Sequence, residues 1–451
     1  MGLTDKYGRA RWADVLIVLA LAFALWRSDF MFFWRDDWDF LDSLRSAGPA
    51  WLFEDHYGHV LPLFKLMYWG EMAVMGTNTQ WHGYVSVLLV GLGSVALLRL
   101  LQRVTGTVPA WTAVVLYTAH PLMFQHVGWI FEQSMSAHLL FQAMAVLQFL
   151  RWRESMRAKD LGWVLVCLIV QGLFFGNGHF LPLALAAGVW LWRDGKRPWY
   201  DALRGAWPFL AFFAVLIAMQ LGANSARVSN GLAWQAVPGM LQGGAYLFGV
   251  NASRVLFLRE GALGAATPWL ASAVFLAVIS LAMLRRDRDR RLAWLYLLWF
   301  GAVFCSVPLM RGGTLVGAEV PHYYTVLSLA PLLLLAEHAL GGHRLWDRFP
   351  RPALLAGGAA LVVGILVIDG ELRRLVSFRH FRNEQLMNKS IIDGTTYYGL
   401  DDPYFTPERY RVDDARGIYL YWRARNRFGP VVGYEKDIDN WTREATIVGK
   451  D

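Results

Sequence analysis

The sequence has few charged residues and almost no cysteine. Of its 451 residues only 17% are Asp, Glu, Lys or Arg, whereas 56% are hydrophobic and 15% aromatic. Soluble domains carry about 25% charged residues, so this balance excludes an ordinary soluble protein. The two cysteines, Cys167 and Cys305, lie in apolar stretches and support neither a disulfide framework nor a cysteine-based metal site.

Motifs that bind soluble nucleotides are also missing. The chain has no Walker A sequence and no glycine-rich dinucleotide fingerprint after a strand. This argues against a nucleotide-driven pump and against a cytoplasmic nucleotide-sugar enzyme. The net charge of +8 comes from arginines in short connections between apolar stretches, which membrane orientation explains better than a nucleic-acid partner does.

Apolar segments long enough to cross a bilayer as helices recur from residue 13 onward. They predict an all-α polytopic membrane protein with about eleven transmembrane helices. The expected spans are 13–33, 80–99, 108–126, 134–150, 161–178, 179–192, 206–222, 266–284, 292–310, 323–340 and 353–369. The stretch 236–258 is apolar but interrupted, for example by Pro238 and Asn251, and we expect a re-entrant or interfacial segment or a hairpin of two short pieces there.

Positive charges predict the orientation in the membrane. If the N-terminus is cytoplasmic, every arginine-rich connection lies on the cytoplasmic side, as the positive-inside rule requires. These connections are near residues 6–11, 99–103, 151–159, 193–204, 285–291 and 344–351. An odd number of spans then places the C-terminus in the periplasm, and a multi-pass protein of a bacterial inner membrane is our expectation.

Two regions differ in composition. Residues 1–370 form the expected transmembrane module, whose first outer loop, 34–79, combines polar and aromatic residues and predicts interfacial helices. Residues 371–451 alternate charges and contain many tyrosines and turn signals. Their aromatic content is too high for a disordered tail, so we expect a small mixed periplasmic domain or lid.

The first outer loop begins with Arg35, Asp36, Asp37 and Asp39, directly after the first span. Carboxylates beside hydrocarbon are costly unless they are paired or used, which makes Asp36 and Asp37 candidate catalytic residues. In a partly desolvated site, such a carboxylate accepts the proton of a substrate hydroxyl as a general base. Arg35 would tune that base or bind an anionic leaving group such as phosphate. The simpler interpretation is an interfacial helix cap, but a cap needs only one aspartate.

Other polar residues near the expected outer face are candidate substrate ligands. They are Asp39, His56, His59, Lys65, Glu132, His179, Arg311, His322 and Tyr323. His56 and His59 are also weak candidates for a divalent metal, because imidazole and carboxylate suit such ions, although substrate contacts or local hydrogen bonds fit their spacing equally. Lys65 and Arg311 suit phosphate, or alternatively serve as interfacial anchors.

The acidic pair directly after the first span, the long first outer loop, about eleven spans and the polar periplasmic tail together resemble the GT-C superfamily of membrane glycosyltransferases. The pattern Arg35-Asp36-Asp37-Trp38, followed by His56-Tyr57-Gly58-His59 and Val60-Leu61-Pro62-Leu63, looks like bacterial members in particular. Protein O-mannosyltransferases and aminoarabinose transferases have a similar plan. The resemblance implies a polyprenyl-phosphate sugar donor, inverting transfer on the periplasmic side, and a lipid, glycan or protein acceptor. It assigns the base to the first acidic residue after the first helix, Asp36, although many members have Asp-Glu where this chain has Asp36-Asp37. It also implies that basic residues such as Arg311 or Lys65 bind the donor phosphate.

Two alternatives are an O-antigen ligase or polymerase, and a lipid-linked sugar flippase or transporter. The former typically relies on basic and histidine residues in later outer loops. The latter is expected to carry polar residues at mid-membrane and often two related halves. The acidic first loop favours the transferase. The sequence does not identify a cofactor for this function, and a divalent metal is an open alternative.

Overall fold

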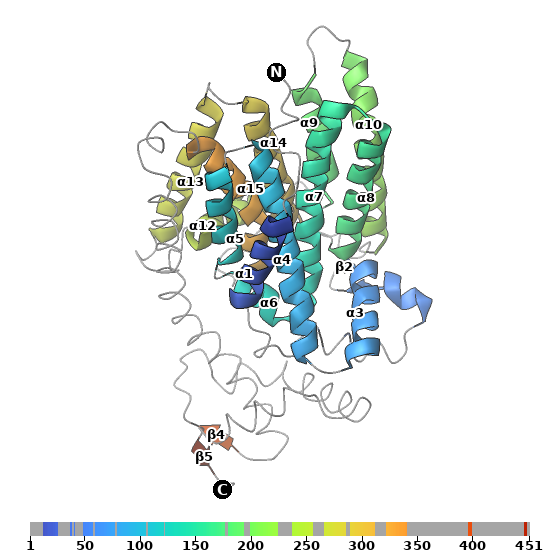
Figure 1. The fold of residues 1–451 in the computed structure, drawn as a ribbon, viewed down its shortest axis with the longest axis vertical. Coiled ribbons are helices and arrows are strands. Elements are labelled where there is room, and N and C mark those ends of the chain that lie inside the picture. The colour runs from blue at the N-terminus through green and yellow to red at the C-terminus, as the bar shows by residue number, and fades with distance from the viewer. Residues whose placement is uncertain are drawn as a thin grey trace.

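The protein is mostly helical in a computed structural model. The structure describes residues 12–25, 37, 40, 48–56, 59–76, 79–104, 107–120, 122–175, 179–193, 199–223, 237–255, 266–285, 289–311, 322–340, 396–398 and 446–448. Its α-helices form one bundle (Figure 1). They are α1 (Trp12–Leu25), α3 (Pro62–Met75), α4 (Thr79–Val104), α5 (Thr107–Thr118), α6 (Met123–Gly128), α7 (Gln133–Ser155), α8 (Ala158–Phe174), α9 (Leu181–Leu191), α10 (Trp199–Ala223), α12 (Val237–Val255), α13 (Thr267–Leu284), α14 (Arg290–Arg311) and α15 (His322–Leu340). Ten of the eleven expected spans overlap these helices, and the eleventh, 353–369, lies outside the described residues.

Three helices in the described part of the chain are long and apolar enough to cross a membrane. They comprise Trp81–Arg103 within α4, Trp199–Met219 within α10, and Thr267–Leu284, which is α13. Shorter apolar helices cover Asp14–Leu25, Leu181–Leu191 and Thr325–Ala339. Only 22% of the apolar windows of α10 and α13 is buried against the protein, so most of their apolar surface faces outward, as lipid contact requires. The count of eleven spans stays a prediction.

Helix α7 is the central helix of the bundle. It packs against α4 and α8 and is buried over most of its length. Because these neighbours separate it from lipid, its first turns carry buried polar side chains such as Gln133, Ser134, His138 and Gln142.

Helix α12 is a single continuous helix, so the prediction of a hairpin over 236–258 is wrong. Its Phe248 packs against Phe275 in the first half of α13 and Phe304 near the end of α14. Gly249 faces Pro268 so closely that a Cβ at Gly249 would lie 2.8 Å from the proline Cβ. These contacts place the second half of α12 beside the beginning of α13 and the end of α14, and the re-entrant or interfacial alternative stays a prediction.

Short elements complete the described structure. In the first loop, a 3-10 helix, η1 (Pro49–Phe53), is followed by the antiparallel strands β1 (Asp55–His56) and β2 (His59–Val60). A second 3-10 helix, η2 (Ile130–Glu132), leads into α7. In the C-terminal region β4 (Thr396–Tyr398) pairs antiparallel with β5 (Thr446–Val448), and the rest of the expected domain 371–451 lies outside the described residues.

Candidate functional site

Helix α3 has a polar buried face and an apolar exposed face. Its buried side chains include Lys65, Tyr68 and Glu71, which recur at helical spacing on one side. The opposite side exposes Leu66, Trp69 and Val74. In Figure 1 the helix lies below the bundle, next to the lower ends of α4 and α8, which it contacts. This arrangement inverts that of a water-soluble helix and directs the polar residues of the first loop inward.

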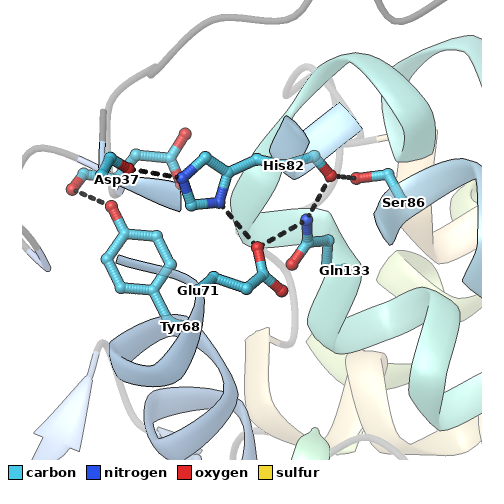
Figure 2. A network of polar contacts seen from close by, with 7 residues as sticks. Asp37, Tyr68, Glu71, His82, Ser86 and Gln133 are labelled. Atoms are coloured by element: carbon cyan, nitrogen blue, oxygen red, sulfur yellow. Dashed lines mark hydrogen bonds and ion pairs between the residues drawn. The ribbon is translucent and has the colours of Figure 1, made fainter. Parts of the chain in front are cut away.

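Glu71 is the centre of a buried polar network (Figure 2). Its Oε2 lies 2.6 Å from Nδ1 of His82, which belongs to the first turns of α4. Gln133, the first residue of α7, donates from Nε2 to the same carboxylate oxygen at 3.3 Å and to the His82 carbonyl oxygen at 2.9 Å. The network therefore joins α3, α4 and α7 at one end of the bundle.

Both ring nitrogens of His82 face acceptors. Nε2 donates to the carbonyl oxygen of Gly76 at 2.9 Å, so this nitrogen carries a proton. The short contact between Nδ1 of His82 and Oε2 of Glu71 is a hydrogen bond, so a second proton lies between these two atoms. Gly76 ends α3 with a φ of 59°, a left-handed conformation that glycine adopts without strain. His82 thus fixes the turn between α3 and α4 and orients Glu71.

Tyr68 connects this network to Asp37, a predicted catalytic residue. Its hydroxyl donates to the Asp37 carbonyl oxygen at 3.1 Å, and Asp37 is fully buried. Burial raises the pKa of Tyr68 well above its usual value, and the negative charges of Asp37 and Glu71 raise it further. The phenol is therefore a neutral hydrogen-bond donor beside two carboxylates.

Aromatic rings lie against this polar group. The Phe40 ring centroid is 5.7 Å from that of Tyr68 and 5.8 Å from that of Phe131, which it stacks on. Phe64 meets Phe40 edge-on at 5.3 Å. Such packing excludes water and lowers the local dielectric, which strengthens electrostatic interactions at Asp37.

Lys65, which we expect to bind an anion, donates hydrogen bonds to backbone carbonyl oxygens of the first loop. It is buried, and Nζ donates to the carbonyl oxygens of Trp51 at 2.7 Å and Glu54 at 2.8 Å. It also lies 5.1 Å from the centre of the Trp51 ring. These contacts hold η1 against α3, whereas binding of substrate phosphate by Lys65 stays a prediction.

The two loop histidines lie opposite one another in the β1–β2 pair. The His56 ring packs on Phe40 with centroids 4.3 Å apart, whereas the His59 ring packs on Phe175 at 4.8 Å. Within the described residues no group of three or more His, Cys, Asp or Glu side chains is placed to hold a metal ion.

The remaining predicted residues are placed as follows. Glu132 is fully buried at the end of η2, next in the chain to Gln133. His179 is buried and lies beside Gly172 of α8. Arg311 ends α14, and His322 and Tyr323 begin α15, but their side chains are outside the described set. Three predicted residues lie wholly outside the described residues: Arg35, Asp36 and Asp39.

Sequence reasoning missed Tyr68, Glu71, His82 and Gln133. A signal for two of them existed, because Glu71 and His82 interrupt strongly apolar stretches, and ionisable residues in such places are functional candidates.

A second buried polar chain crosses the middle of the bundle. Trp299 of α14 donates from Nε1 to Oε1 of Gln142 at 3.1 Å, and Nε2 of Gln142 lies 2.6 Å from Nε2 of His138. The other ring nitrogen of His138 then donates to the Gln171 carbonyl oxygen at 2.9 Å. Every step has one donor and one acceptor, so the chain fixes the positions of α7, α8 and α14.

Comparisons of the sequence and structure with family models, curated proteins and solved structures found no match.

Proposed function

We propose that the protein is an integral membrane glycosyltransferase of the GT-C type, using a polyprenyl-phosphate sugar donor. The observation that supports this proposal is the burial of Asp37 beside Tyr68, Glu71 and His82 at the end of a helical bundle with apolar outer surfaces. Ionisable residues kept at such a position are expensive and are typical of a reaction or binding site.

The proposed reaction needs one base. The acceptor hydroxyl oxygen forms a bond to the anomeric carbon while the bond from that carbon to the phosphate oxygen breaks. Polyprenyl phosphate leaves with the bonding electrons, and the hydroxyl proton passes to the carboxylate of Asp36 or Asp37. Attack opposite the leaving group inverts the anomeric configuration.

The described neighbours suit this role for Asp37. Tyr68 orients the backbone at Asp37 through its hydroxyl, and the Glu71–His82 pair holds α3 in place against α4. In the proposed topology the chain crosses a bacterial inner membrane eleven times, with the site on the periplasmic side. The acceptor is a lipid, a glycan or a protein.

Transfer by purified protein in nanodiscs tests the proposal. A panel of polyprenyl-phosphate sugars and candidate acceptors is supplied, and release of polyprenyl phosphate is measured for wild type, Asp36→Asn and Asp37→Asn. One of these substitutions should abolish turnover while donor binding is retained. The control is Asp14→Asn on α1, which removes a carboxylate that contacts Arg99 at 3.4 Å. Absence of turnover and of donor binding with every lipid-linked sugar would refute the proposal.

A transporter or flippase is the second candidate, and the polar chain from Trp299 to Gln171 is the observation that bears on it. Its groups bond to one another, however, as in a structural element. Asp37→Asn should leave transport of a lipid-linked sugar nearly unchanged in a transporter and stop turnover in a transferase. A ligase or polymerase would instead depend on histidines and arginines of later loops.

A further inference from the structure

Two buried oxygen atoms in the network around Glu71 accept no hydrogen bond in the described structure. They are Oε1 of Glu71 and Oε1 of Gln133, two residues whose exposed fractions are 6% and 0%. The other polar atom of each side chain is engaged, because Nε2 of Gln133 donates to Oε2 of Glu71 at 3.3 Å. That bond holds the two oxygens near one another, and Figure 2 shows them on the same side of it.

The neighbours of Gln133 fix which atom of its amide is the oxygen. Nε2 faces two acceptors, the Glu71 carboxylate and the His82 carbonyl oxygen, so the nitrogen must lie on that side. Both atoms without a partner are therefore acceptors. A buried acceptor without a donor costs folding free energy, and a ligand that brings two donors would explain why both are kept.

The charge balance favours a neutral ligand. His82 carries one proton on Nε2, which donates to the carbonyl oxygen of Gly76, and a second proton lies between Nδ1 and Glu71. Wherever that second proton resides, Glu71 and His82 together have no net charge. This pair offers a bound cation no counter-charge, and an anion would meet only acceptors. Hydroxyl groups are neutral and donate, so they fit both conditions.

The position of the two oxygens relative to Asp37 suits a sugar ring. Tyr68 donates to the Asp37 carbonyl oxygen and precedes Glu71 by three residues on α3, which is a rise of about 4.5 Å along the helix. The charges of Asp37 and Glu71 both act on the Tyr68 phenol. A sugar ring whose hydroxyl groups reach Glu71 and Gln133 can therefore place its anomeric carbon near the proposed base.

We infer that Oε1 of Glu71 and Oε1 of Gln133 accept hydrogen bonds from two neighbouring hydroxyl groups of the transferred sugar, and so select the sugars that carry them. The inference rests on the proposed function, because it places the sugar of the donor at this site. Both oxygens are shielded from solvent, so the sugar reaches them through a shift of α3, which packs against α4 and α8. Sugar binding is thus coupled to movement of the helix that carries Glu71.

Binding of sugar analogues, measured without turnover, tests this inference. The full chain in nanodiscs is titrated with polyprenyl-phosphate hexoses and pentoses. Each sugar that binds is then compared with analogues in which one ring hydroxyl at a time is replaced by hydrogen. At one position the loss should weaken binding about 10- to 100-fold, as for a hydrogen bond to a charged group, and at a neighbouring position about 3- to 10-fold, as for a neutral pair.

Two substitutions assign these hydroxyl groups to their partners. Gln133→Met removes the amide oxygen at similar side-chain length and should abolish the smaller penalty, so that the parent sugar and its deoxy analogue bind within about twofold. Glu71→Gln keeps an acceptor for His82 but removes the charge, and should reduce the larger penalty to below about tenfold. The matched control Gln142→Met changes a buried glutamine of the same helix that bonds to other partners, and should leave both penalties unchanged.

Penalties that keep their wild-type size in both variants would overturn the inference, whether or not all sugars bind more weakly. A proton or a buried water would then complete the two oxygens, and Glu71 and Gln133 would have a structural role alone. Glu71→Gln keeps the test decisive if Gln133→Met fails to fold. Failure of every lipid-linked sugar to bind the wild type would instead overturn the proposed function and this inference with it, so the two failures are distinguishable.

Discussion

The contact between Glu71 and His82 should be one of the most strongly coupled pairs in the described structure. His82→Leu removes the 2.6 Å partner of Glu71 and leaves its buried carboxylate with the Gln133 amide at 3.3 Å. Breaking one side of a buried ion pair typically costs about 3–5 kcal/mol, because the other charge stays buried without compensation. Glu71→Leu should also be costly, since it removes the carboxylate partner of the buried Nδ1 of His82 and one of the two acceptors of the Gln133 amide.

The double substitution should cost much less than the sum, because an apolar pair of similar volume leaves no buried charge. We expect a coupling free energy of at least about 2 kcal/mol from the double-mutant cycle. The assay is equilibrium unfolding in mixed micelles, followed by tryptophan fluorescence. The control cycle uses Arg103 and Glu154, a partly exposed ion pair, whose coupling should be below about 1 kcal/mol. Equal coupling in the two cycles would refute the reasoning.

Three further substitutions test other parts of the structure. Gly249→Ala should destabilise the protein by about 1–3 kcal/mol, because the new methyl group would clash with the rigid ring of Pro268. The control Gly301→Ala has open space around it and should be neutral or stabilising by up to about 1 kcal/mol. Thermal unfolding in detergent measures both variants. Trp299→Phe should cost about 1–3 kcal/mol in the same assay, because the buried glutamine oxygen loses its donor. The raised pKa of Tyr68 means that its contribution to stability is full below about pH 10 and is lost above it, where the unfolded chain ionises first. Raising the pH from about 9 to about 11 should therefore reduce the free energy of unfolding less in Tyr68→Phe than in the wild type. The control Tyr84→Phe, which changes an exposed tyrosine, should behave like the wild type. Equal losses in all three proteins would contradict this explanation.

The helices were the most predictable part of the fold. A membrane helix needs a long continuous apolar stretch, and that requirement is local in the sequence. The hairpin expected over 236–258 was wrong because Pro238 was read as an interruption. It is the second residue of α12, in the first turn, where the backbone nitrogen of any residue makes no helical hydrogen bond and a proline therefore costs nothing.

The site was only partly predictable. Asp37 could be found because an acid beside hydrocarbon is unusual, and its burial in the network is consistent with that expectation. The pairing of Glu71 with His82 joins two helices, and no spacing along one chain reveals such a contact. Lys65 shows the same limit, since an ammonium group that binds carbonyl oxygens and one that binds phosphate look alike in sequence.

The inverted helix α3 ties the site to the physical state of the bilayer. Its outward side chains, Leu66, Trp69 and Val74, find their lowest free energy at a fixed depth in the membrane, while Tyr68 and Glu71 on the other side are fixed to the protein. A thinner or thicker bilayer pulls on the outward face through hydrophobic mismatch, at a cost of fractions of a kcal/mol per Å. We expect that force to tilt α3, and a tilt of this helix would change the position of Tyr68 relative to Asp37. Acyl-chain length is thus a variable that acts on the geometry of this site without touching it.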